Sequence, residues 1–497
     1  MLKMKHHSFS LAALTGFACL CSAGTLLAQQ PTVKNVELTD LSAFKNPGSS
    51  WQIVGGVAAD INKQNFLYTS KGAGILVNYP TKNQHGADLF SVAEHGDIDL
   101  ELDYLMASGS NSGIYLQGRY ELQLEDSWAT KNASYANNGG IYERWNDGKP
   151  EGQKGYEGHS PRQNASKAPG LWQHLKISFQ APRFNNSGAK IANARFLKVE
   201  LNGVLIQENV DLSGPTRGSM SADEQASGPL RLQGDHGAVA FRNIKIWAKP
   251  IVKANGDSDS ETAITSKVKN ADEANTNNYQ VDPVLVDAPV NTVLRSFMDL
   301  ANHVRVVHAV SVGSAEQVHY TYDLDKGAIV QVWRGGFLDA TPMWHDRGDG
   351  SSRPRGAVQQ FGKPILNLAK LSSAQTAWVN DTTGTGFKIN GYELDDQDRP
   401  VFMYTIYGKQ VKDATVVIEN GKGISRTISV ENPSADLYVR LADAASIEEL
   451  NGMYLIDDKS YYIKLDNAGD KPVIRDSNGR KELIMPLRSS LSYSILF

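Results

Sequence analysis

Cysteine is nearly absent from this chain of 497 residues, which contains only Cys19 and Cys21. Both lie in a leading segment that we expect to be removed on export. Without them the chain holds no thiol, so disulfides, thiolate metal sites, covalent haem attachment and cysteine nucleophiles are excluded. Such a protein depends on its hydrophobic core for stability, and about 470 residues suffice to build one.

The sequence also lacks an excess of charge of either sign. Its 50 basic and 54 acidic residues give a formal charge of −4, which argues against nucleic acid or an anionic membrane as partner. With 41% hydrophobic and 21% charged residues, global disorder, a coiled coil and a polytopic membrane protein are excluded. The 44 glycines and 19 tyrosines favour a turn-rich β protein.

The first 28 residues are typical of a secretory signal. Lys3 and Lys5 precede an apolar stretch from Phe9 to Ala28, and we expect cleavage after Ala28. The apolar stretch is short for a membrane span, which disfavours an uncleaved anchor. The expected location is therefore the periplasm or the exterior, with no integral membrane span after cleavage.

Alternating apolar and polar residues predict an all-β fold. Ile98–Tyr104 alternates with period two, and Asn202-Gly203 predicts a hairpin turn between two such segments. Short antiparallel strands of this kind favour a sandwich or jelly roll. We predict an N-terminal segment at 29–49, a first β domain at 50–248, a polar flexible linker at 249–283 and a second β-sandwich-type domain at 284–497.

The segment Asn111–Trp128 carries the most chemical information. By alternation, one face holds Ile114, Leu116, Tyr120, Leu122 and Leu124. The other face, if the alternation survives a bend at Gly118, holds Tyr115, Gln117, Arg119, Glu121 and Gln123. Planar hydrogen-bonding groups beside an aromatic ring suit sugar hydroxyls and rings. A simple ion pair between Arg119 and Glu121 on a solvated face stays open.

A series of short motifs extends this observation over residues 50–248. They are Asn111–Gly113 with Tyr115, Arg119–Glu121, Gly139–Tyr142, Asn164–Trp172, Ala181–Phe184, Asn202-Gly203, Gly228–Gln233, His236-Gly237 and Phe241–Asn243. Their order and spacing resemble the 3-keto-disaccharide hydrolase domain family. The resemblance implies a concanavalin-like jelly roll acting on glycosides oxidised at carbon 3, by hydrolysis or by elimination followed by hydration. It also implies an upstream sugar 3-dehydrogenase that supplies the oxidised saccharide.

Such chemistry requires a base for the acidified C2 proton and donors for the enolate oxygen. His236, which stands between glycines, is the preferred base, and Glu121 is the second acid–base group. Arg119 is expected to hold the enolate or a hydroxyl. The predicted substrate-binding residues are Tyr115, Gln123, Trp128, Gln233 and Arg242, with Trp128 stacking on the sugar. An ion pair with an acidic neighbour is the alternative role for Arg242.

Other functions remain open at this point. The first domain can be a carbohydrate-binding module without turnover, and both domains can be parts of an envelope scaffold. A conventional two-carboxylate glycoside hydrolase is disfavoured, because Glu121-Leu-Gln123-Leu-Glu125 carries Gln where that chemistry needs Asp. No cofactor is predicted. The sequence has no clustered metal-ligand pattern and gives little support to a metal site, and a divalent cation stays open only as an alternative.

The second domain resembles a β domain found at the ends of multidomain secreted bacterial proteins. The segments that carry the resemblance are His319–Ala328, Gln331–Phe337, Thr341–Gly350 and Arg399–Phe402. No activity follows from it. Aromatic and charged residues in one stretch are typical of either a sugar cleft or loop anchoring, and these are Trp333, Trp344, His345, Asp346 and Arg347.

Overall fold

The computed structural model describes residues 33–248, 282–345, 348–379, 381–466 and 470–497. The predicted signal at 1–28 and all but the end of the predicted linker lie outside the described residues. The fold is all-β, as predicted, and the described residues contain one short α-helix, α1 (Thr341–Trp344), and two 3-10 turns, η1 (Ala301–His303) and η2 (Glu419–Gly421). In the described part of the chain, no helix is long and apolar enough to cross a membrane.

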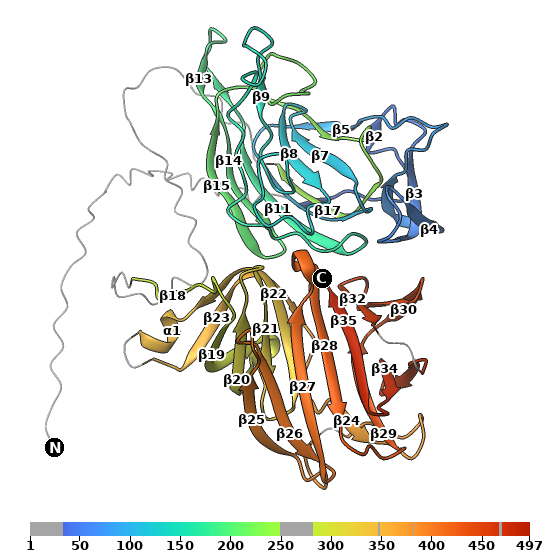
Figure 1. Cartoon of the computed structure of the whole chain (residues 1–497). Helices are drawn as coiled ribbons and strands as arrows, with labels where there is room; N and C mark the ends of the chain where they lie inside the picture. Colours follow the sequence, from blue (N-terminus) through green and yellow to red (C-terminus); the bar gives the residue numbers. More distant parts are fainter. Residues whose placement is uncertain (1–32, 249–281, 346–347, 380, 467–469) are drawn as a thin grey trace, which may run out of the picture.

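Two antiparallel sheets form the first domain (Figure 1). The large sheet runs in the order β15-β14-β11-β6-β17-β4-β3, and β1 also pairs with β17. Its strands are β1 (Val33–Asn35), β3 (Trp51–Ala59), β4 (Leu67–Asn78), β6 (Ile98–Met106), β11 (Trp172–Gln180), β14 (Ala194–Leu201), β15 (Val204–Leu212) and β17 (Val239–Ala248). The small sheet runs β2-β5-β16-β7-β8, from β2 (Phe44–Lys45), β5 (Leu89–His95), β7 (Asn111–Leu116), β8 (Tyr120–Glu125) and β16 (Gly228–Leu232).

Two short hairpins extend from these sheets. They are β9 (Arg144–Trp145) with β10 (Gly155–Tyr156), and β12 (Arg183–Phe184) with β13 (Lys190–Ala192). Because β1 and β2 belong to the two sheets, residues 33–45 are part of the sandwich and the domain begins before residue 50.

The core of the first domain follows from the alternation in its strands. Leu100, Leu102 and Tyr104 of β6 enter a core cluster, which on the other side contains Ile114 and Leu122 of the small sheet. The residues of β6 that alternate with these side chains face outward. One of them, Glu101, forms ion pairs with Lys245 at 3.0 Å and with Lys176 at 3.7 Å. The acidic row of β6 is therefore a solvated sheet face.

Three sheets form the second domain. The first runs β18-β22-β21-β20-β19-β23, from β18 (Leu285–Val286), β19 (Thr292–Leu300), β20 (Val304–Gly313), β21 (Val318–Asp323), β22 (Ala328–Asp339) and β23 (Ser351–Gln360). The second runs β24-β29-β34-β33, from β24 (Leu368–Lys370), β29 (Leu437–Ala444), β33 (Val473–Ser477) and β34 (Arg480–Pro486). The third runs β25-β26-β27-β28-β35-β32-β31-β30, from β25 (Lys388–Leu394), β26 (Pro400–Ile406), β27 (Lys409–Val417), β28 (Gly423–Val430), β30 (Ile447–Leu450), β31 (Met453–Ile456), β32 (Tyr461–Leu465) and β35 (Ser490–Leu496).

The core of the second domain lies between these three sheets. One cluster contains Val310 of the first sheet, Val439 of the second and Ile424 of the third. The same interior holds a fully buried ion pair, in which the Arg426 guanidinium donates to the Asp413 carboxylate over 2.9 Å from Nε. Burying such a pair is tolerable only because each charge has its partner.

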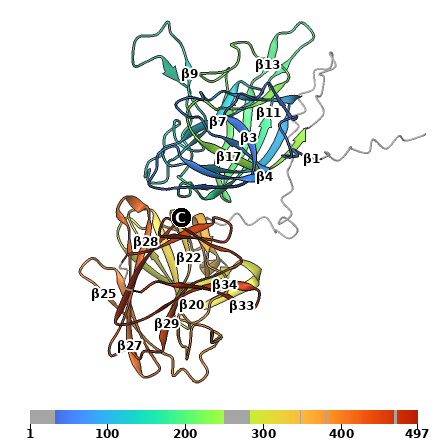
Figure 2. The ribbon, with the colours of Figure 1, turned by 90° about the vertical axis from the view of Figure 1, so that its right-hand side faces the viewer.

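The two domains are stacked against each other, as both views show (Figures 1 and 2). A cluster of apolar side chains joins them: Trp128, Ala168 and Leu171 from the first domain, and Met453, Leu455, Tyr462 and Leu496 from the second. We call this set the interdomain cluster. Tyr462 Oη donates to the Pro169 carbonyl at 2.9 Å, which fixes the contact with a polar bond.

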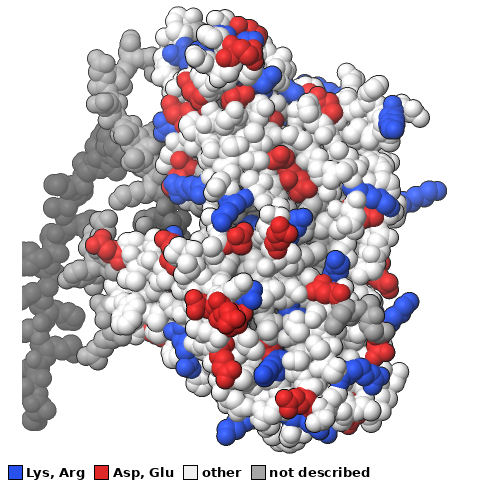
Figure 3. Space-filling model, in the orientation of Figure 1, with Lys and Arg blue, Asp and Glu red and all other residues white. Residues whose placement is uncertain are grey.

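The surface carries its charges in a mixed pattern. On the face drawn in Figure 3, basic and acidic side chains are interspersed over both domains. This distribution agrees with the balanced composition and provides no extended basic area on that face.

Candidate active site

One face of the small sheet is lined by polar and aromatic side chains. Tyr115 of β7 pairs across the sheet with Glu121 of β8 and with Arg231 of β16, so the three side chains share a face. By alternation, Gln123 and Gln233 lie on it as well. We call these five residues the polar face. Their neighbours in sequence, such as Ile114 and Leu122, enter the core.

Glu121, on the outer strand β8 of the polar face, is buried, with 2% of its surface exposed. Space for it comes from Gly113 on the adjacent strand, because a Cβ there would stand 2.3 Å from Glu121 Oε1. Burial raises the pKa of Glu121 to about 8, although the hydrogen bond from the Tyr115 hydroxyl and the charge of Arg231 act in the opposite direction. At neutral pH this carboxyl is mostly protonated and close to its titration point.

Arg231 connects Glu121 to further charged and aromatic groups. Its guanidinium pairs with Asp88 at 2.6 Å and stacks 4.1 Å from the centre of the Tyr115 ring. Arg231 Nε and Gln233 Oε1 are buried, and neither has a hydrogen-bond partner among the described residues. Buried polar atoms are ordinarily paired, so both atoms have bonding capacity left for a polar ligand or a water.

Aromatic and charged side chains border the polar face on one side. The Arg217 guanidinium lies 3.7 Å over the Trp145 ring and 3.6 Å from Glu143. Burial raises the pKa of Tyr142, and the nearby Glu121 carboxylate raises it further. Rings combined with paired charges are the groups that bind sugars through stacking and hydrogen bonds.

The predicted base, His236, does not contact Glu121. Its side chain is 56% exposed and its Nδ1 is bonded to the carboxylate of the adjacent Asp235. Asp235 itself is close enough to raise the pKa of Glu121 through its charge. His236 is therefore adjacent in sequence to a residue whose charge acts on Glu121, but its own imidazole is exposed.

Arg119 departs from the predicted alternation. Gln117 and Gly118 both have positive φ values, 53° and 66°, so they form a tight turn between β7 and β8. The turn ends the alternation, and the Arg119 guanidinium bonds to the Asp223 carbonyl at 2.6 Å and to the Gln117 carbonyl at 2.9 Å. Arg119 and Gln117 are thus loop anchors away from Glu121, and no ion pair joins Arg119 to Glu121 in the described structure.

Trp128 and Arg242 also lie elsewhere. Trp128 belongs to the interdomain cluster, where its Nε1 donates to the Phe497 carbonyl at 2.9 Å. Arg242 is in β17 of the large sheet and pairs with Asp103 at 3.2 Å and with Asp458 of the second domain at 2.7 Å. Sugar stacking by Trp128 was a wrong prediction, and Arg242 follows its alternative, the ion pair.

The aromatic and charged residues of the second domain that suggested a sugar cleft do not lie together. Trp333 is fully buried in a core cluster, whereas Trp344 is 69% exposed. Asp346 and Arg347 lie outside the described residues.

Sequence reasoning missed Arg231, Asp88, Tyr142 and Arg217. Alternation in the Gly228–Gln233 motif could have found Arg231, because it stands two residues before Gln233 and shares its face. Asp88 and Arg217 have no such pattern, since they come from loops that only the fold brings together. In the part of the chain that the structure describes, no group of three or more His, Cys, Asp or Glu side chains is arranged to hold a metal ion.

The raised pKa of Glu121 predicts how stability changes with pH. Between its usual value of 4.5 and about 8 the folded protein keeps a proton that the unfolded chain releases, so the free energy of unfolding falls as pH rises. We expect Glu121→Gln to remove this loss, so that urea unfolding finds the variant more stable relative to wild type at pH 9 than at pH 5, by about 4 kcal/mol. An equal difference at both pH values would contradict the raised pKa.

Comparison with known proteins agrees with the resemblance seen in the sequence. Residues 39–247 match the family model of the 3-keto-alpha-glucoside-1,2-lyase-like domain. No curated protein matches the chain.

Several solved structures are similar to the chain. Two are each described as a "putative glycosyl hydrolase" from Parabacteroides distasonis. The first has 25% identity over 48% of this chain and 100% of its own, with a TM-score of 0.28. The second has 19% identity over 40% of this chain and 99% of its own, with a TM-score of 0.26. Carbohydrate-binding module CBM66 from Bacillus subtilis has 14% identity over 40% of this chain and 96% of its own, with a TM-score of 0.19. The family model therefore covers most of the first domain, and over residues 39–247 this chain is similar to the 3-keto-alpha-glucoside-1,2-lyase-like family.

Proposed function

We propose that this protein is an exported enzyme that cleaves 3-keto-glycosides at the polar face of its first domain. The observation that supports this most is Glu121, a buried carboxyl with a pKa of about 8 beside unpaired polar atoms. A general base works best when its pKa lies near the working pH, and at pH 7 about one tenth of such a group is ionised. The match of the family model supports the substrate class.

The proposed reaction begins with proton removal from C2 of the oxidised sugar. The Glu121 carboxylate takes this proton, and the electron pair of the C–H bond forms an enolate with the ketone at C3. The buried Arg231 Nε–H is a donor for the enolate oxygen, and Gln233 Oε1 is an acceptor for a sugar hydroxyl.

Collapse of the enolate forms the C1–C2 double bond, restores the ketone and expels the aglycone oxygen from C1. The leaving oxygen takes a proton from the protonated Glu121 or from water. Addition of water across C1 and C2 then gives the free 3-keto sugar, so the sum of the steps is hydrolysis. An upstream sugar 3-dehydrogenase would supply the substrate.

The test compares a chromogenic 3-keto-glucoside with the same glucoside before oxidation. We expect aglycone release from the keto form and a rate at least about 100-fold lower from the unoxidised form, whose C2 proton is not acidic. Equal release from both would contradict the C2 mechanism and favour a two-carboxylate hydrolase. Binding of the keto form without release would contradict the enzyme and leave a carbohydrate-binding module.

A further inference from the structure

The second domain contains a cavity of about 410 Å³ where its three sheets meet. The first sheet contributes Ile329 of β22, the second contributes Arg440 of β29, and the third contributes Arg426 of β28. The loop that holds Phe361 and Lys363 closes one side. This volume is within the range of pockets that hold small organic ligands.

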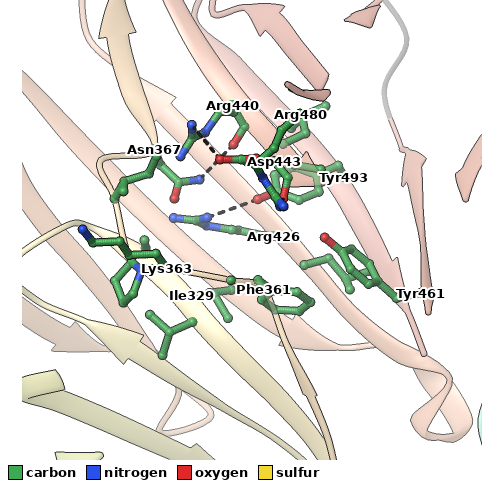
Figure 4. A pocket seen from close by; sticks show the side chains of 18 of the residues that line it. Ile329, Phe361, Lys363, Asn367, Arg426, Arg440, Asp443, Tyr461, Arg480 and Tyr493 are labelled. Atoms are coloured by element: carbon green, nitrogen blue, oxygen red, sulfur yellow. Dashed lines mark hydrogen bonds and ion pairs between the residues drawn. The ribbon is translucent and has the colours of Figure 1, made fainter. Parts of the chain in front are cut away.

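The walls of this cavity differ in character. Figure 4 shows polar side chains along one wall, including Asn367, Arg440 and Arg480, and the apolar Ile329 and Phe361 across from them. Such a division suits a ligand with one polar edge and one apolar face, as a pyranose ring has.

Positive charge exceeds negative charge among the residues that line the cavity, because Lys363, Arg426, Arg440 and Arg480 are basic and Asp443 is the one acidic residue of this lining. Outside the lining, Asp413 pairs with Arg426, and Glu482 is shared by Arg440 and Arg475. Glu482 binds Arg440 at 2.9 Å and Arg475 at 2.6 Å, while Asp443 binds Arg480 at 2.5 Å and Arg440 at 3.5 Å. An anionic group of a ligand would complete this network.

Arg480 is the cation best able to bind such a group. Its side chain is 46% exposed, and its hydrogen bonds to described residues use Nε and Nη2, both toward Asp443. The exposed Lys363 at the edge of the cavity adds a second cation and offsets the charge of Asp457, which acts on Arg480. A guanidinium fork binds a planar carboxylate with two parallel bonds, which a neutral sugar cannot use.

Together these observations limit the ligand. A bare phosphate or sulfate ion would fill a small part of the volume and gain nothing from Ile329 and Phe361. A neutral monosaccharide would leave the excess of positive charge unused. We propose that this cavity binds a monosaccharide that carries a carboxylate, with Arg480 holding the carboxylate, Asn367 a hydroxyl and Phe361 the ring.

Calorimetric titration of the full chain tests the assignment with D-glucuronate, D-glucose and inorganic phosphate as probes. We expect D-glucuronate to bind at least about tenfold more tightly than either of the other two. Tighter or equal binding of phosphate would overturn the sugar-acid assignment in favour of a simple anion site, and equal binding of glucose would overturn the role of the carboxylate.

Two matched arginine variants locate the binding. Arg480→Gln is expected to weaken D-glucuronate binding by at least about tenfold, because it removes the fork but keeps a polar side chain of similar length. Arg488→Gln breaks another exposed pair in the same domain, with Asp470 at 3.0 Å, and is expected to leave binding unchanged. Unchanged affinity in Arg480→Gln, or no binding by wild type up to about 10 mM, would overturn the proposal. Aglycone release at the first domain should be the same in both variants, which separates this test from the proposed enzyme activity.

Discussion

Replacing Glu121 by glutamine is expected to lower the rate of aglycone release from a 3-keto-glucoside by about 1,000-fold. Glutamine keeps the shape of the side chain in the space left by Gly113 and can still accept the hydrogen bond from Tyr115. It cannot take a proton from C2. The measurement is the initial rate of release at saturating substrate, together with the affinity of the variant for the intact glycoside, which should change little.

The matched control for this variant is Glu101→Gln. Glu101 lies on the outer face of the large sheet, where its partners are Lys245 and Lys176. Removing its charge should leave the rate within about twofold of wild type. If Glu121→Gln retained a comparable rate, the base would have to be another group, and His236→Ala would be the next variant to measure.

Replacing Trp128 by alanine is expected to destabilise the protein by about 3–5 kcal/mol. The ring is 8% exposed and packs in the interdomain cluster, and its Nε1 holds the Phe497 carbonyl. Truncation leaves a cavity between the domains and an unpaired carbonyl. Urea unfolding of the full chain should show a lower midpoint and a separation of the transition into two, one for each domain.

Trp344→Ala serves as the control for the loss of a tryptophan. This ring is 69% exposed, and its removal should change the free energy of unfolding by less than about 0.5 kcal/mol. The rate of aglycone release should be unaffected by Trp128→Ala under conditions in which the protein stays folded. If Trp128→Ala kept its stability but lost affinity for the keto-sugar, the result would contradict the interdomain role and support stacking of Trp128 on the sugar.

Alternation predicted which residues of Asn111–Trp128 share a face, because period two is a property of each strand alone, but the prediction was one bent strand, whereas β7 and β8 form an antiparallel pair. It placed Ile114, Leu122 and Leu124 on one face, and in the structure this face enters the core. It failed at Gln117 and Arg119, because the hairpin turn places two residues at positive φ and ends the strand. A bend at Gly118 was expected, but its effect on the direction of neighbouring side chains depends on backbone angles that composition does not specify.

The remaining errors concern contacts between distant parts of the chain. Trp128 bonds to a residue 369 positions away, and Arg242 bonds to Asp458 across the domain boundary. No local pattern carries such information. Arg231 differs, because it lies within a quoted motif and shares the face of Gln233. Arg119 is close to Glu121 only in the sequence, whereas the neighbours of Glu121 on the polar face, Tyr115 and Arg231, lie on other strands of the sheet.

The interdomain cluster has a consequence for how the chain is made. The first domain leaves the ribosome well before residues 453–496 are synthesised. During that interval Trp128 and Leu171 form an exposed apolar surface. A newly made first half is then prone to self-association until its other half arrives. A gene fragment that encodes only residues 33–248 should consequently yield an aggregation-prone protein. Polar substitutions at Trp128 and Leu171 should restore its soluble expression.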